Sequence, residues 1–116
     1  MLVRIDPSST APLFEQVAAS LRRALTDGSP APGEQLPPAR ELAAALEINV
    51  HTVLRAYALL RDEGLIDLRR RRGAVVLGGA SSRARLVELA TELVREAKRA
   101  DVGLEELTGL LKERYS

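Results

Sequence analysis

Apolar residues recur at intervals of three and four positions through the first half of the chain, the spacing of amphipathic helices. A first helix is expected to begin near residue 11. Ser9 and Thr10 precede it and are expected to cap it, since their hydroxyl groups can accept hydrogen bonds from the free N–H groups of the first turn. Gly28 is expected to end it. Its apolar face comprises Leu13, Phe14, Val17, Leu21, Ala24 and Leu25.

Residues 28–38 contain two glycines and four prolines, a composition typical of a loop with a restricted shape. A second helix is predicted to follow and to end at about Leu46. After a turn of about three residues, Asn49 is a favourable N-cap for a third helix that reaches about Glu63. Two helices joined by so short a turn indicate a helix-turn-helix. The expected inward positions are Leu42, Ala43 and Leu46 in the second helix, and Val53, Ala56, Tyr57 and Leu60 in the third.

Two short apolar stretches, residues 65–68 and 74–77, follow Gly64 and predict a β-hairpin. The turn between them carries four consecutive arginines, residues 69–72. Burying unpaired guanidinium groups would cost several kcal/mol, so the tip is expected to project into solvent, where it suits a polyanion. A solvated charge run that binds nothing is the alternative. Three helices followed by such a hairpin predict a winged helix.

The stretch from Gly78 to Ser82 has the composition of a linker. We therefore expect a winged helix-turn-helix domain at residues 1–79 and a two-helix tail at residues 80–116, with a break near residues 101–103. The fold class is mainly α with a small β-hairpin. The apolar stripe of the tail is wider than so short a segment can bury, which favours packing against a second copy of the chain over folding back on its own domain. The expected dimer contacts are Leu86, Leu89, Leu93, Leu104, Leu107 and Leu111.

Seventeen basic and sixteen acidic residues leave a net charge of +1, so attraction to nucleic acid must come from local patches such as the arginine cluster. All the basic residues except Lys98 and Lys112 are arginine, which favours planar contacts with phosphate or guanine. The absence of cysteine excludes disulfides and thiolate metal sites and is compatible with a reducing cytoplasm. No stretch has the length of a signal peptide or membrane span. We expect a cytoplasmic protein without cofactor or metal.

Four motifs now define a resemblance: APLFEQV at residues 11–17, PGEQLPPARELA at 32–43, NVHTVLRAY at 49–57 and EGLI at 63–66. In this order and spacing they resemble the DNA-binding domain of GntR-family transcriptional regulators, over residues 10–77. The third motif and the brief tail are similar to the short YtrA-type branch, which lacks the large effector domain of other branches. The chain departs from the family pattern at Pro38, Val50 and Arg71, which leaves open the base sequence that is read and the conformation of the wing.

The resemblance implies a set of DNA contacts from the second helix, the start of the third helix, its outer face and the wing: Arg40, then Asn49, His51 and Thr52, then Arg55, then Arg70, Arg71, Arg72 and Gly73. Independently, the free N–H groups at a helix N-terminus attract phosphate, which suits polar residues there. Each position also has a structural alternative. Asn49 can serve only as an N-cap, Thr52 as a first-turn residue, His51 as an exposed surface residue, and Arg40 as the partner of a nearby glutamate, Glu41 or Glu47.

Taken together, the resemblance implies a homodimeric bacterial transcription factor, a repressor, that binds a palindromic operator in double-stranded DNA. A small-molecule effector of so short a chain would have to bind at the dimer interface or between domain and tail. The alternative is a winged-helix module that docks on an acidic protein through its basic wing. An enzyme is not expected, because His51 is the only histidine and neither a cysteine nor a glycine-rich phosphate loop is present.

Overall fold

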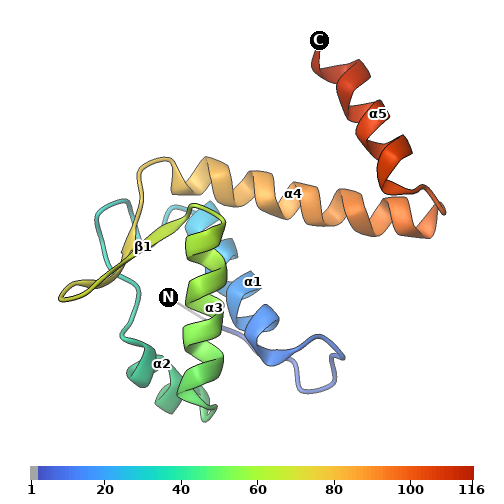
Figure 1. Cartoon of the computed structure of the whole chain (residues 1–116). Helices are drawn as coiled ribbons and strands as arrows, with labels where there is room; N and C mark the ends of the chain where they lie inside the picture. Colours follow the sequence, from blue (N-terminus) through green and yellow to red (C-terminus); the bar gives the residue numbers. More distant parts are fainter. Residues whose placement is uncertain (1–2) are drawn as a thin grey trace. The chain divides into compact units, whose positions relative to one another are not determined.

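A computed structural model describes residues 3–116, in which five helices and one two-stranded antiparallel sheet are formed (Figure 1). A first compact unit ends at Leu86, and a second spans Val87–Ser116. The expected class, mainly α with a small β-hairpin, is confirmed. The elements are α1 (Leu13–Thr26), α2 (Ala39–Leu46), α3 (Val50–Asp62), β1 (Ile66–Arg69), β2 (Gly73–Val76), α4 (Ala80–Arg99) and α5 (Leu104–Tyr115).

The start of α1 differs from the expectation, because Pro12 and neither Ser9 nor Thr10 is its N-cap. The carbonyl of Pro12 accepts hydrogen bonds from the N–H groups of Glu15 and Gln16, both at 3.1 Å. The hydroxyl of Ser9 accepts instead from the N–H of Ala11, within the preceding turn. Proline suits this position because its fixed φ leads into the helix and it carries no N–H that would need a partner.

The helix-turn-helix is formed as predicted. Glu47 ends α2 in the left-handed region, with φ 56°, and so reverses the chain within the short turn. The side chain of Asn49 caps α3 by accepting a hydrogen bond of 2.8 Å from the N–H of His51. The inward residues of α3 are buried at the positions that the periodicity predicted, Val53, Ala56, Tyr57 and Leu60. In α2, Leu42 and Ala43 are buried and Leu46 is half-buried.

The wing is the antiparallel pair of β1 and β2, and its turn projects from the helical core (Figure 1). The pairing joins Ile66 to Val76 and Arg69 to Gly73, so Arg69 belongs to β1 and three arginines remain in the turn. The proline-rich loop lies beside β2, which the sequence did not predict. The N–H of Leu36 donates to the carbonyl of Ala74, and the N–H of Val76 donates to the carbonyl of Glu34, each at 2.8 Å. These bonds tie the base of the wing to the segment that leads into α2.

Glu63, just after α3, connects three parts of the first unit. Its carboxylate accepts two hydrogen bonds of 2.9 Å from the guanidinium of Arg22 in α1. This bidentate pair is largely shielded from water, an arrangement in which an arginine and a carboxylate interact strongly. The backbone carbonyl of Glu63 accepts from Nε of Arg83 in α4. The C-terminal end of α3 is therefore held to both α1 and the first turns of α4.

The expected linker at residues 78–82 is wrong, because α4 already begins at Ala80. Ala80 and Ala84 are buried in the core of the first unit. The hydroxyl of Ser81 donates a 2.7 Å hydrogen bond to the carbonyl of Thr26. Within residues 78–82 only Ala80 is buried, whereas the two glycines and two serines are exposed. The expected domain boundary after residue 79 therefore differs from the division into compact units, which falls after Leu86.

The second unit contains the remainder of α4 and all of α5. The chain turns between them at Asp101, which has φ 58°, and Gly103 is the N-cap of α5. Leu107 is buried within this unit, unlike the other leucines expected at a dimer interface, so it contributes to the unit's own packing. Large apolar side chains remain exposed on both helices: Leu89, Leu93, Val94, Leu104, Leu110 and Leu111, with Leu86 exposed just before the unit begins.

Candidate nucleic-acid interface

The N-terminal end of α3 presents polar side chains to solvent. Asn49 and His51 are exposed and Thr52 is half-buried. Because Asn49 uses its side-chain oxygen to cap the helix, its structural role is present, and its amide NH₂ group remains at the surface as a hydrogen-bond donor. The first N–H groups of α3 lie here as well, so the end of the helix combines donors with the positive end of the helix dipole.

Arg55 lies one turn further along α3 and contacts α1. Its guanidinium carbon is 3.8 Å from the centre of the Phe14 ring, a cation–π arrangement. Leu13 and Phe14 of α1 form one side of a shallow depression of about 290 Å³, and Asn49, His51, Thr52 and Arg55 form the other. The structure therefore brings four of the expected site residues together around one hollow.

The wing arginines form a second basic surface. Arg70, Arg71 and Arg72 are exposed in the hairpin turn, with Gly73 after them. Arg72 reaches the carbonyl of Gly33 at 3.5 Å, the outer limit of a hydrogen bond. Among residues 3–116, Arg70 and Arg71 have neither a carboxylate partner nor a hydrogen-bond acceptor. Arg69 differs, because its guanidinium pairs with Asp67 at 3.0 Å.

A depression of about 490 Å³ separates the wing from α3. Arg71, Arg72 and Gly73 line one side of it, and Leu54 lines the other. Leu54 and Leu68 are exposed apolar residues in this lining that sequence reasoning did not single out. The helical pattern placed Leu54 outside the buried stripe, and nothing in the local sequence indicates that α3 and the wing flank one hollow.

Arg40 is exposed on α2. Neither Glu41 nor Glu47 pairs with it, and no ion pair of Arg40 occurs in the described part of the chain. The expected alternative, a surface ion pair on its own helix, is therefore not formed. Arg40 lines neither of the two depressions beside α3, so it stands apart from the other expected contacts.

Tyr57 is a buried residue of α3 that connects this helix to the segment before α2. Its hydroxyl donates a hydrogen bond to the carbonyl of Pro37, which ties α3 to the segment before α2. Burial raises the pKa of Tyr57 to about 12. The folded state thus holds this proton more tightly than the unfolded state, in which tyrosine titrates at about pH 10.

We expect Tyr57 to make stability fall with pH in the alkaline range. Its contribution is fully present below about pH 10 and is lost as the pH rises toward about 12. Tyr57→Phe removes this titration and one hydrogen bond, so it should lower the free energy of unfolding by about 1 kcal/mol at neutral pH and flatten its decline above about pH 10. Urea unfolding across this range measures both effects. An unchanged alkaline decline in the variant would assign it to another group.

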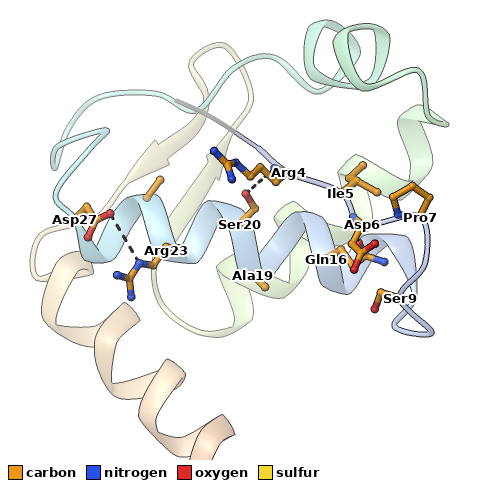
Figure 2. A pocket seen from close by; sticks show the side chains of 11 residues that line it. Arg4, Ile5, Asp6, Pro7, Ser9, Gln16, Ala19, Ser20, Arg23 and Asp27 are labelled. Carbon is orange, nitrogen blue, oxygen red and sulfur yellow. Dashed lines mark hydrogen bonds and ion pairs between the residues drawn. The ribbon is translucent and has the colours of Figure 1, made fainter.

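A groove outside these surfaces lies between the N-terminal segment and α1 and has a volume of about 880 Å³ (Figure 2). The backbone N–H of Arg4 donates to the hydroxyl of Ser20, and Arg23 pairs with Asp27 at 3.9 Å. Hydrogen bonds from the side chain and backbone of Ser8 lower the pKa of Asp6. None of the expected site residues lines this groove.

Neither a metal cluster nor a membrane span is found in the part of the chain that the structure describes. No group of three or more metal-ligating side chains gathers within residues 3–116. Over the same range, none of the helices combines the length and the apolar character needed to cross a bilayer.

Comparisons with known proteins agree with the fold. A family model described as bacterial regulatory proteins, gntR family, matches residues 13–76. The HTH-type transcriptional repressor YtrA of Bacillus subtilis is 33% identical over 118 residues, covering 97% of this chain and 91% of that protein. Among solved structures, YtrA from Sulfolobus acidocaldarius, a GntR-family transcription factor, is 28% identical with a TM-score of 0.62, covering 96% of this chain and 94% of that chain. A GntR family transcriptional regulator from Listeria monocytogenes shares the fold, with a TM-score of 0.65 at 24% identity, over 94% of this chain and 98% of that chain.

Proposed function

This chain belongs to the gntR family of bacterial regulatory proteins, and we propose that it binds a palindromic operator as a homodimer. It is a DNA-binding transcriptional regulator and not an enzyme. The observation that carries the proposal is the pairing of two exposed surfaces on the first unit: the polar N-terminal end of α3 and the wing arginines Arg70, Arg71 and Arg72. Such a pair can enter a major groove and hold the adjacent backbone.

The two surfaces would have different tasks. Asn49, His51 and Thr52 stand at the start of α3, where side chains of a recognition helix meet base edges, and they would choose the sequence. The wing arginines would contact phosphate, which attracts any duplex equally. Arg55 lies at the depression beside α1 together with Asn49, His51 and Thr52, and Arg40 would make a separate contact from α2. Their placement at the surface is compatible with these roles.

The exposed leucines of the tail support the homodimer. Leu89 and Leu93 lie four residues apart on one face of α4, and Leu104 and Leu111 are exposed on α5. A second copy offers the same apolar surface, so a two-fold arrangement would cover both. Two recognition helices related by this symmetry, about 34 Å apart, would read the two halves of a palindrome.

We further propose that the chain acts as a repressor in the cytoplasm, where bacterial DNA is located. Its relative in Bacillus subtilis is named a transcriptional repressor, and the match extends over most of both chains. A dimer seated on an operator can block access of the transcription machinery to the promoter. Selection of bound duplexes from a random pool, followed by reporter assays with the selected site, tests both the palindrome and the direction of regulation.

Substitutions can separate recognition of the base sequence from sequence-independent contacts with the DNA backbone. Thr52→Ala and His51→Ala should each reduce discrimination between the selected operator and a scrambled duplex by about 1–3 kcal/mol where the native side chain bonds to a base edge. Arg72→Ala should weaken binding to both duplexes by a similar factor, because phosphate contacts carry no sequence information. Competition titrations measure the ratio. An unchanged ratio in both α3 variants would show that α3 does not read the bases through its first turn.

A further inference from the structure

Phe14 is the only phenylalanine of the chain, and its helical spacing placed it on the apolar face of α1. The structure does not use it as a core residue. It lies in the first turn of α1, is only half-buried, and is absent from the hydrophobic cluster that contains Val17 and Leu21. Its ring instead supports the guanidinium of Arg55, whose carbon lies 3.8 Å from the ring centre. Phe14 and Arg55 are 41 positions apart in the sequence, and their contact joins α1 to α3.

The contact leaves the hydrogen-bonding capacity of Arg55 intact. A guanidinium stacks through its flat face, whereas its five N–H donors point outward in its plane. Within residues 3–116, Arg55 has no hydrogen-bond acceptor and no ion-pair partner, so the ring is the one group there that engages its guanidinium. The same depression contains Asn49, His51 and Thr52. Arg55 is thus held at the surface beside these residues with its donors unused.

We propose that Phe14 is a positioning residue that holds Arg55 ready to contact a DNA phosphate, so that the first turn of α1 is part of the DNA-binding apparatus. The inference rests on the proposed function. A free arginine side chain has many rotamers, and ordering it upon binding has an entropic cost. An aromatic support that orders the side chain before DNA arrives reduces this cost. The negatively charged phosphate then meets an arginine that is already oriented.

The test compares the full-length chain with Phe14→Leu, Phe14→Tyr, Arg55→Gln and the double variant Phe14→Leu/Arg55→Gln. The probe is a mixed-sequence DNA duplex, because a phosphate contact does not require the operator. A cation–π contact at an exposed site corresponds to about a two- to fivefold change in affinity. We expect Phe14→Leu to weaken binding by this factor, Phe14→Tyr to retain wild-type affinity, and Phe14→Leu to cause no further loss when Arg55→Gln is already present.

The salt dependence distinguishes positioning from direct contact. Arg55→Gln should reduce the slope of log K against log salt by about 0.9 for each phosphate that Arg55 neutralises. Phe14→Leu should leave this slope unchanged, because the charge that neutralises the phosphate is still present. A merely structural role of Phe14 would not produce a loss that disappears in the Arg55→Gln background.

A spectroscopic measurement keeps the inference testable even where Phe14→Leu impairs folding. Protons on the Arg55 side chain above an aromatic ring are shifted upfield by the ring current, and this shift should be present in the wild-type chain without DNA. Wild-type resonances without the shift would overturn the inference. So would wild-type affinity in a folded Phe14→Leu variant, or an equal loss from Phe14→Leu in both backgrounds. A wild-type chain that does not bind the duplex would instead overturn the proposed function.

Discussion

Replacing Arg70, Arg71 and Arg72 together by alanine is expected to weaken binding to duplex DNA by about 100-fold at moderate salt, since each guanidinium–phosphate contact contributes about 1 kcal/mol or more. The slope of log K against log salt should fall by about 0.9 for each phosphate that these arginines neutralise. All three side chains are exposed in the turn between β1 and β2 and contribute nothing to the core. The fold should therefore survive, and titrations at several salt concentrations measure both quantities.

A matched control is available on the second unit. Arg95, Arg99 and Arg114 are also exposed, and their joint replacement by alanine removes the same three positive charges from a net charge of +1. This control should retain most of the affinity, because none of its three arginines belongs to the two surfaces that we propose to contact DNA. Equal losses in the two variants would mean that overall charge, and not the wing, determines DNA binding.

Leu89→Glu combined with Leu93→Glu is expected to convert the homodimer into a monomer at micromolar concentration. Both leucines are exposed on one face of α4, and full burial of a leucine is worth about 1.5–3 kcal/mol. A carboxylate in an apolar interface adds a desolvation cost of several kcal/mol, and two-fold symmetry applies each change twice. We expect the dimer dissociation constant to rise by more than about 100-fold, a change that exceeds about 2.7 kcal/mol. Sedimentation analysis measures the change.

The monomeric variant should also lose its preference for two half-sites over one, because no second recognition helix is held in register. Thr91→Glu combined with Arg95→Gln changes the net charge by the same amount as the double leucine variant. Thr91 lies two positions from each leucine, and Arg95 lies two positions from Leu93. Two positions correspond to about 200° around the helix. This control should remain dimeric. A dimer that persists in the leucine variant would place the interface elsewhere and leave the apolar face of α4 without this role.

Local features of the first unit were predictable because they depend on neighbours in the sequence. Asn49 caps α3 through a contact two residues away, with the N–H of His51. The periodicity of α3 identified its buried stripe, since a helix with one apolar side must turn that side inward. The third helix was expected to reach about Glu63, and Gly64 just after it adopts φ 79°, a conformation that glycine enters without strain.

The errors arose where one composition is compatible with two structures. The Gly-Gly-Ala-Ser-Ser stretch fits a flexible linker as well as a close contact between small residues. Only the structure shows that α4 begins inside this stretch, at Ala80, and that Ala80 and Ala84 pack in the core. Ser9 likewise has a capping hydroxyl, but Pro12 lies nearer to α1 and ends the non-helical segment.

The amino-acid sequence by itself determined the order of the helices, the helix-turn-helix, the arginine turn of the wing and the polar start of α3, because each depends on spacing, capping or turn chemistry within a few residues. Only the tertiary structure decided which distant residues meet. Phe14 reaches Arg55, the loop before α2 pairs with β2, and Glu63 joins Arg22 to Arg83. Such contacts follow from the way the elements pack around a shared core, and the periodicity of a single element does not specify its partner.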